Sequence, residues 1–522
     1  MNNFRFVYLL ALLIISYSAA AQLNNNAPKV KTFNGILEGV NNSGVKIFKG
    51  VPFAAPPVGQ LRWREPQPVK NWEGVLKADK FGPRPMQKPI FSDMNFLSAK
   101  ISEDCLYLNV WTPAVTGNEK LPVLVYFYGG GLIAGSGDEP RYAGETLARK
   151  GIIAITVNYR LGIFGFFSHP ELTKDSPNHA SGNYGYLDQT AALRWVQTNI
   201  AAFGGDPTRV TIAGESAGSI SVSALMCSPL SKNLFAGVIG SSGSLMGALS
   251  PIPLGQAEMN GQLTAKDLKI ETLAGLREIP AEKLLDAKGQ FSPDIDGYFI
   301  TKPPVEIYTK GEQAKVPALI GWNSLEMNSG YLLKGKASTL VNFKEVVKKT
   351  FGDTTDLVIN LYHATDDASA SVAATELASD MFIGFSTWKW TDIQKKTSGK
   401  PVFRYRYCHP RPLMIPALNK SPKTTGAVHS ADIEYAMGNL YTNRVYDWQA
   451  EDFEVSELFQ SYYLNFIKTG NPNGLGVPEW PSINNQTLPG VLQIDVDTHV
   501  ATNSDLEKRY EFLNNFYFPT KK

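Results

Sequence analysis

The chain has 522 residues, of which 43% are apolar and 19% are charged, a composition typical of an ordinary globular protein. Its 50 basic and 48 acidic residues leave a net charge of +2, which gives no electrostatic argument for a nucleic-acid or anionic-membrane partner. The 6 histidines and 3 cysteines are scattered without metal-ligand spacing, so we expect no metal site.

The first residues have the pattern of an export signal. Arg5 precedes an apolar run over residues 6–15, and Ala19-Ala20-Ala21 supplies the small residues that a signal peptidase needs. The run is only about half of the ~20 residues that span a bilayer. We therefore expect residues 1–21 to be a signal peptide and residues 22–522 to be one exported domain, periplasmic or secreted. No later segment is long and apolar enough to span a membrane.

Apolar, β-branched segments alternate with helical ones along the rest of the chain, as in α/β folds. Because several of these segments are apolar on both faces, we expect central parallel strands covered by helices on each side. The expected strands are residues 123–128, 152–159, 210–213, 317–321 and 402–407.

Apolar residues at helical spacing mark residues 186–199, and a run of small residues over 219–226 is the second helix expected near the strands. Two further segments, residues 266–283 and 342–361, look helical and lie outside the core pattern. We expect these two to cover the active-site end of the sheet.

A nucleophile motif follows the strand at residues 210–213. Gly214-Glu215-Ser216-Ala217-Gly218 is G-x-S-x-G between a strand and a helix, the arrangement of α/β hydrolases. A serine at such a tight turn has a strained backbone, and side chains two positions away would collide with the neighbouring strand and helix. The motif predicts that Ser216 is a nucleophile, with a chance match as the alternative.

Three glycines follow the strand at residues 123–128. Tyr128-Gly129-Gly130-Gly131 can turn backbone N–H groups toward a developing oxyanion with no side chain in the way. A plain loop and a phosphate-binding loop are the alternatives, but no G-x-G-x-x-G register fits here. The segment 330–336 has the spacing of a nucleotide-binding loop, yet Ala337 stands where a Mg²⁺-binding hydroxyl belongs.

The motifs and their surroundings resemble the type-B carboxylesterase family, which includes cholinesterases and para-nitrobenzyl esterases. The matching segments cover most of the chain outside residues 1–21, and Ser216 lies within the densest part. They are residues 50–63, 102–111, 158–162, 182–189, 203–207, 214–218, 234–235 and 242–244.

The resemblance implies an α/β-hydrolase fold, with a large, mostly parallel central sheet flanked by helices and helical insertions that form a gorge or cap. It implies no cofactor and a small-molecule ester as substrate. It assigns the oxyanion-hole N–H groups to Gly130, Gly131 and Ala217. It places the triad acid at Glu326, within residues 321–326, and the base at His429, within residues 426–429. The order Ser, Glu, His is that of α/β hydrolases.

The residues themselves also favour His429 as the base. A serine at neutral pH needs a base with a pKa near 7, and only 6 histidines are present. His429 lies between small residues in an expected loop, downstream of an acid candidate, although a surface histidine would look the same. Rival acids remain open, namely Asp296, Asp353, Asp356 and Asp432.

The chain departs from the family pattern at two places: Tyr128 stands where many members carry histidine, and a cysteine is missing from the loop that borders the gorge. The family cysteine at the position of Cys105 usually pairs with an upstream cysteine, but residues 81–87 contain none. Cys227 and Cys408 match no family disulfide either, so we expect reductant to leave stability unchanged. The expected activity is therefore ester hydrolysis through an acyl-enzyme. A non-catalytic cholinesterase-like binding protein, an amidase or a thioesterase on the same fold remain alternatives.

Overall fold

The computed structural model describes residues 27–247, 249–415, 424–484 and 489–519. The expected signal peptide, residues 1–21, therefore lies outside the described residues. Within the described part of the chain, no helix is both long and apolar enough to cross a membrane.

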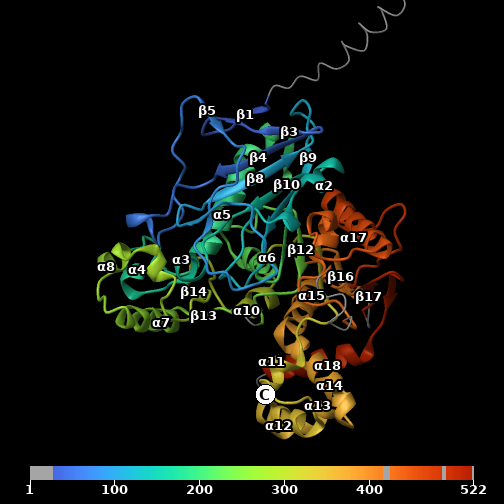
Figure 1. Ribbon diagram of the computed structural model, residues 1–522. Coiled ribbons are helices and arrows are strands. Elements are labelled where there is room, and N and C mark those ends of the chain that lie inside the picture. Colours follow the sequence, from blue (N-terminus) through green and yellow to red (C-terminus); the bar gives the residue numbers. More distant parts are fainter. Residues whose placement is uncertain (1–26, 248, 416–423, 485–488, 520–522) are drawn as a thin grey trace, which may run out of the picture.

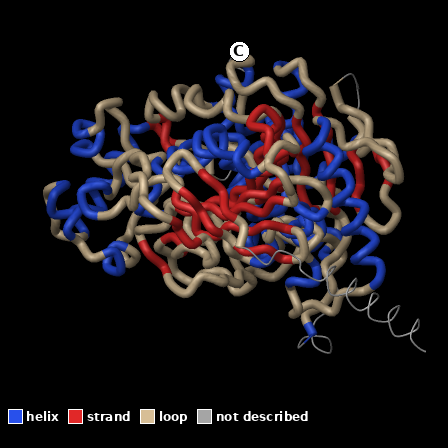
Figure 2. Tube along the Cα trace, turned by 90° about the horizontal axis from the view of Figure 1, so that it is seen from above, coloured by secondary structure: helices blue, strands red, loops and turns tan. Residues whose placement is uncertain are grey.

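An 11-stranded mixed sheet runs through the middle of the molecule, and helices lie on both sides of it (Figure 2). Its parallel strand pairs are adjacent in the centre, from β10 to β17, and its antiparallel pairs lie toward the two edges. In sheet order the strands are β18 (His499–Ala501), β17 (Val491–Ile494), β16 (Val402–Tyr407), β15 (Ala318–Asn323), β12 (Gly237–Ser241), β11 (Gly205–Glu215), β9 (Leu121–Phe127), β10 (Ile153–Val157), β8 (Tyr107–Thr112), β4 (Val45–Pro52) and β3 (Val40–Asn42).

The five strands expected from sequence are confirmed as β9, β10, β11, β15 and β16. Every residue of β10, β12 and β15 is buried. This explains why their sequences do not alternate between apolar and polar residues. Smaller sheets pair β1 (Lys29–Lys31), β2 (Ile36–Glu38) and β5 (Val75–Lys77), β6 (Arg84–Pro85) with β7 (Ile101–Ser102), and β13 (Ile252–Pro253) with β14 (Asp294–Ile295).

Helices cover the sheet, and the two expected near the strands are confirmed as α5 and α6. The helix α6 begins directly after β11 and is buried along its whole length. The helices of the main body are α2 (Glu145–Arg149), α3 (Gly162–Phe166), α4 (Pro170–Asp175), α5 (Tyr184–Asn199), α6 (Ala217–Cys227), α7 (Leu254–Asp267), α8 (Leu273–Glu278), α9 (Ala281–Leu284), α10 (Pro304–Thr309), α15 (Phe385–Thr397), α16 (Ile433–Met437) and α17 (Ala450–Thr469).

A helical lobe projects from the C-terminal half of the molecule (Figure 1). It has a hydrophobic core of its own, in which Phe343 and Leu377 pack with Leu506 and Tyr510, residues more than a hundred positions further along the chain. A π-helical turn, Asp380–Gly384, joins the lobe to α15. The lobe helices are α11 (Ser329–Leu333), α12 (Leu340–Phe351), α13 (Thr355–Leu361), α14 (Asp367–Ser379) and α18 (Ser504–Tyr517).

The expectation for residues 266–283 and 342–361 was wrong in detail. The first segment contains the end of α7, all of α8 and the start of α9, because Thr272 caps α8 and Pro280 precedes α9. The second is split by Gly352, at φ 58°, into α12 and α13. Neither segment lines the cavity around Ser216, whose helical wall comes from the start of the lobe and from the π-helical turn.

Candidate active site

Ser216 lies at the sharp turn between β11 and α6. Its backbone has φ 55° and ψ −123°, a region that costs a residue with a side chain about 1–3 kcal/mol. The Ser216 N–H donates to the carbonyl of Ser241 on the next strand, at 2.8 Å, which fixes the turn to the sheet. The turn therefore presents the Ser216 hydroxyl above the carboxyl end of the strand, where α/β sheets place reacting groups.

The glycines of the motif are required by close packing. A Cβ on Gly214 would lie 2.4 Å from the backbone of Gly218. A Cβ on Gly218 would lie 2.0 Å from the carbonyl oxygen of Phe127 on β9. Both distances are far below van der Waals contact, so the expected collision with the neighbouring strand and helix is confirmed.

His429 lies between Ser216 and Glu326. Its Nε2 is 2.9 Å from Ser216 Oγ, and its Nδ1 is 2.6 Å from Glu326 Oε2. The three side chains come from segments far apart in sequence, and the structure brings them into one hydrogen-bonded chain. The edge of Phe382 packs against the imidazole, with ring centroids 5.2 Å apart, which limits the rotation of the ring.

Glu326 is buried and held by three groups. Beyond the contact with His429, its Oε1 accepts hydrogen bonds from Ser242 Oγ at 2.5 Å and from the Asn323 N–H at 2.6 Å. Asn323 in turn donates from Nδ2 to the carbonyl of Val428, the residue before His429, at 2.8 Å. The carboxylate is thus fixed on the side that faces His429.

The rival acids occupy other positions. Asp296 accepts hydrogen bonds from the backbone N–H groups of residues 298–300, so it holds a turn. Asp353 lies in a short 3-10 turn, and Asp356 lies in the first turn of α13. Asp432 is buried behind the site, where it accepts from Asn323 Nδ2 at 3.2 Å, and burial raises its pKa to about 6. No hydrogen bond joins any of these four carboxylates to His429 in the described part of the chain.

The three N–H groups expected to form the oxyanion hole belong to the two turns next to Ser216. Gly130 and Gly131, at φ 107° and 64°, form the turn after β9, and their N–H groups have no hydrogen-bond partner among the described residues. Ala217 is the first residue of α6, where N–H groups lack an intrahelical acceptor. A Cβ on Gly129 would lie 2.7 Å from the Glu215 carbonyl, which shows how closely this turn approaches the nucleophile. The arrangement suits an oxyanion hole.

Glu215 adds a second ionisable group beside His429, one that the sequence did not indicate. Its Oε1 lies 3.4 Å from His429 Nε2 and has no hydrogen-bond partner among the described residues. Burial raises the pKa of Glu215 to about 8. Burial disfavours a charge on His429 as well, but Glu215 and Glu326 outweigh it and raise the pKa of His429 to about 9. The sequence indicated a base with a pKa near 7; the difference arises because these two carboxylates flank one imidazole.

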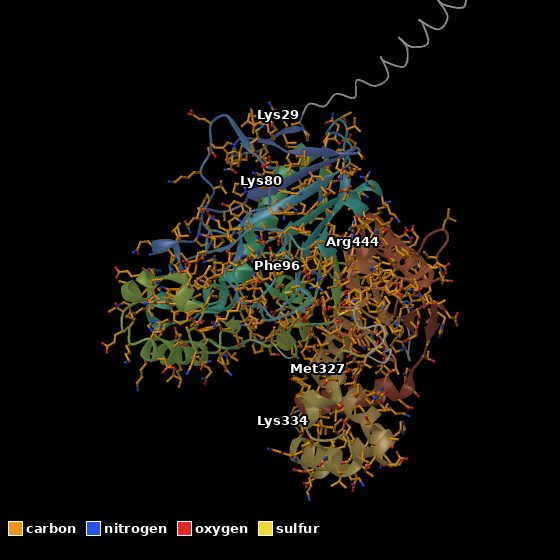
Figure 3. The ribbon with its side chains drawn as sticks, in the orientation of Figure 1. Lys29, Lys80, Phe96, Met327, Lys334 and Arg444 are labelled. Carbon is orange, nitrogen blue, oxygen red and sulfur yellow. The ribbon has the colours of Figure 1, made fainter. Side chains whose placement is uncertain are left out.

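The Ser216 hydroxyl opens into a cavity of about 540 Å³. Its walls are mainly apolar, with contributions from the β6–β7 loop, the lobe and the segment around His429. Met327 lies where the lobe joins the main body (Figure 3). Its N–H donates to Ser379 Oγ at the end of α14, at 3.0 Å. The apolar side chains that line the cavity are Phe91, Met94, Tyr142, Met327, Phe382 and Val428.

The β6–β7 loop, which lacks the family's upstream cysteine, is held by polar contacts instead. Gln87 donates to the Gly135 carbonyl at 2.8 Å and accepts from the Gly135 N–H at 2.9 Å. Arg84 donates to the Ser98 carbonyl at 2.7 Å and so fastens the far end of the loop. All three cysteines of the chain are free thiols. The gorge wall is therefore formed without a disulfide.

The signals for the missed residues differ. Glu215 is part of the nucleophile motif, and Ser242 lies within a matched segment, so a closer interpretation of those motifs would have found them. Phe382 and Arg141 carry no such signal, because only the packing of the lobe and of the loop after β9 brings them to the cavity.

The fold and the site define an α/β hydrolase of the serine kind. The family model of the carboxylesterase family matches residues 26–513. Fumonisin B1 esterase of Sphingopyxis macrogoltabida is 35% identical over 486 residues, covering 88% of this chain and 86% of that protein. Liver carboxylesterase of Sus scrofa is 34% identical, covering 89% of this chain and 88% of that protein. A solved structure of PNB esterase superimposes with a TM-score of 0.80 at 30% identity, covering 95% of this chain and 100% of that chain. The chain belongs to the carboxylesterase family, and it is a hydrolase of carboxylic esters.

Proposed function

We propose that the protein hydrolyses small-molecule carboxylic esters through an acyl-enzyme on Ser216, with His429 as general base and Glu326 as the acid of the triad. The observation that carries this proposal is the continuous contact from Ser216 Oγ to His429 Nε2 at 2.9 Å and from His429 Nδ1 to Glu326 Oε2 at 2.6 Å, within one cavity.

The first half of the reaction forms the acyl-enzyme. Ser216 Oγ attacks the ester carbonyl carbon while His429 Nε2 takes the hydroxyl proton. The carbonyl oxygen becomes an oxyanion, which the N–H groups of Gly130, Gly131 and Ala217 stabilise. Glu326 stabilises the imidazolium at Nδ1. His429 then gives its proton to the leaving alcohol as the C–O bond breaks.

The second half releases the acid. His429 removes a proton from a water molecule, which attacks the acyl carbon. The bond between the acyl carbon and Ser216 Oγ then breaks, and Oγ regains a proton from His429 Nε2. All three side chains of the triad are present and in contact. Ester hydrolysis requires this arrangement, whereas a protein that only bound its ligand would have no use for it.

We also propose that the enzyme acts outside the cytoplasm, on the strength of the signal-peptide pattern in residues 5–21. Fractionation of cells that express the full-length chain tests this. We expect the activity in the periplasm or medium, and the N-terminus of the recovered protein at Gln22. Recovery of full-length protein from the cytoplasm alone would contradict the proposal.

The test of the mechanism uses Ser216→Ala and His429→Ala with a neutral aryl ester, 4-nitrophenyl butyrate. We expect kcat to fall by about 10⁴ or more in each, because triad members act as one unit. Melting temperature checks that the fold is intact. A fluorophosphonate should label the wild-type protein at Ser216 and should not label Ser216→Ala. Near-native turnover in either variant, with host esterases removed, would contradict the assignment.

A further inference from the structure

Two buried arginines line the cavity around Ser216 and play no part in the proposed chemistry. Arg411 makes three hydrogen bonds: its guanidinium donates to the Ser430 carbonyl at 2.8 Å, to Glu434 at 2.8 Å and to the Tyr446 hydroxyl at 3.1 Å, and only its buried Nε has no partner among the described residues. Arg411 therefore holds the segment after His429 in place, and its charge is balanced by the buried Glu434.

The Arg141 side chain is also buried, and it has two carboxylate neighbours but makes fewer hydrogen bonds than Arg411. Its guanidinium, which carries five N–H groups, makes one hydrogen bond within the described part of the chain, from Nη1 to Asp93 at 3.2 Å. Its Nε lies 2.8 Å from Glu139 Oε1, but the two do not form a directed hydrogen bond. Its Nη2 has no partner among the described residues. The side chain lines the cavity, so these donors lie beside the space that a substrate would fill.

Arg62 is a buried arginine whose guanidinium is fully paired, and it serves as a comparison for Arg141. Arg62 and Arg141 are both 5% exposed. Arg62 donates to both carboxylate oxygens of Glu103 and to three backbone carbonyls, so all three of its nitrogens are engaged. A buried guanidinium with a single hydrogen bond is costly, because its other donors have left water without replacement. Of the two arginines that line the cavity, Arg141 makes fewer hydrogen bonds, and its Nη2 can donate to a further acceptor.

The charges next to Arg141 do not satisfy it. Asp93 contacts Nη1 alone, and its side chain is 42% exposed at the cavity entrance. Glu139 is buried 2.8 Å from Arg141 Nε, and burial raises its pKa to about 7, so its carboxylate is only partly ionised near neutral pH. The buried Glu434 also lies near Arg141, but it is hydrogen-bonded to Arg411, so the positive charge of Arg141 beside the cavity is only partly offset.

We infer that this enzyme prefers esters that also carry a free carboxylate, and that Arg141 binds this carboxylate while Ser216 attacks the ester carbonyl in the same cavity. A carboxylate supplies two acceptor oxygens, which match the paired donors on one edge of a guanidinium. The inference rests on the proposed function, since it names the substrate class of that site.

The cavity restricts the form of such a substrate. Its volume of about 540 Å³ holds a molecule of modest size, and its apolar residues surround the reacting carbonyl. The substrate is therefore a short monoester of a dicarboxylic acid, or an ester whose alcohol part bears the carboxylate, with an apolar portion between the two groups.

The experiment compares matched probes that differ in one charge. For the acyl side, 4-nitrophenyl hydrogen glutarate is compared with 4-nitrophenyl 5-methylhexanoate, in which an isopropyl group replaces the carboxylate. For the alcohol side, 4-carboxyphenyl butyrate is compared with 4-isopropylphenyl butyrate. We expect wild-type enzyme to have a higher kcat/KM for the anionic member of at least one pair.

The variants are Arg141→Met and Arg141→Lys. In Arg141→Met the anionic-to-neutral ratio of kcat/KM for that pair should fall by about 10- to 100-fold, as expected for loss of a charge-assisted pair of hydrogen bonds. Arg141→Lys should keep only part of the wild-type ratio, because lysine lacks the paired donors. The control, Arg209→Gln, removes an exposed arginine from the first half of β11, away from Ser216, and should leave the ratio unchanged.

Several outcomes would overturn the inference. One is a ratio that changes by less than twofold in Arg141→Met for both pairs. If that variant does not fold, a wild-type preference for the neutral member of both pairs is equally decisive. Ser216→Ala is assayed on the neutral probes together with the Arg141 variants. It separates the proposed mechanism from the proposed substrate class. If it is inactive while the ratios do not depend on Arg141, only the substrate class is wrong; if it remains active, the proposed mechanism itself has failed.

Discussion

The cavity is bounded by two regions that are built differently, the carboxyl end of the central sheet and the helical lobe. At the sheet, backbone hydrogen bonds join each active-site turn to the next: the Ser216 N–H donates to Ser241, and the Ser242 N–H donates to Gly321. At the lobe, Met327 and Phe382 reach the cavity as apolar side chains, and Met327 packs against a separate hydrophobic core. The reacting atoms therefore depend on directed bonds, whereas the shape of the cavity depends on packing.

The largest effect should come from the acid that the sheet end holds. Glu326→Gln removes the charge that stabilises the imidazolium, so we expect kcat to fall by about 10²- to 10⁴-fold with little change in KM. Asp296→Asn is the matched control, because this buried carboxylate holds a turn elsewhere; it should lower the melting temperature and spare kcat. The assignment of Glu326 would be wrong if its variant kept more than half of wild-type kcat while Asp296→Asn or Asp432→Asn was inactive.

Ser242 tests whether the bonds behind Glu326 matter for the reaction. Its hydroxyl donates to Glu326 Oε1 at 2.5 Å, opposite the oxygen that contacts His429. Ser242→Ala leaves the Asn323 N–H as the other donor to Oε1, so we expect kcat to fall by about tenfold through looser positioning.

The control for Ser242 is Ser244→Ala. Ser244 is also fully buried, but it donates to the carbonyl of Ser386 in α15 and does not contact the acid. Equal losses of kcat in the two variants would show a general packing effect. Restoration of kcat by Ser242→Thr, which keeps the hydroxyl, would support the positioning role.

Glu215 should set the pH at which the enzyme becomes active. His429 accepts the serine proton only when neutral, and a raised pKa means that activity increases with pH through a value above its ordinary 6.5. Glu215→Gln removes one of the carboxylates that favour the protonated imidazole, so the rise of kcat/KM should move to lower pH by about one unit.

The control for this pH shift is Glu457→Gln, an exposed glutamate paired with Lys150. Its pH profile should match that of the wild type. A profile in Glu215→Gln that is unchanged, or that moves to higher pH, would show that Glu215 does not act on His429.

The smallest effect should come from the lobe. Phe382→Ala enlarges the cavity, so kcat/KM for a bulky acyl group such as benzoyl should increase about three- to tenfold relative to acetyl. Phe512→Ala, a partly buried lobe residue that does not line the cavity, should leave this ratio unchanged. If both variants shifted the selectivity alike, the lobe would act through its general stability rather than through the cavity wall.

The sheet end was largely predictable from sequence, and the lobe was not. The apolar strands and the G-x-S-x-G turn around Ser216 are local patterns, so sequence alone indicated them. The family pattern led to Glu326 and His429, which the structure places together. Residues 342–361 were expected over the active site but instead pack on α14, because their apolar faces match a core contributed by distant helices. Tertiary packing also brings Glu215 close to His429 and leaves Arg141 with a single hydrogen bond.

The discontinuous core of the lobe has a consequence for the order in which the protein is made. The helices α11 to α14 are synthesised well before α18, yet Leu506, Tyr510 and Leu513 of α18 complete their core. During translation the strands of the sheet end can pair up to β16 while one side of the lobe is still uncovered. The wall formed by Met327 and Phe382 can therefore reach its final shape only after residue 513 has left the ribosome. A chain truncated before α18 would carry the nucleophile and the histidine but would expose the apolar surface meant for that last helix.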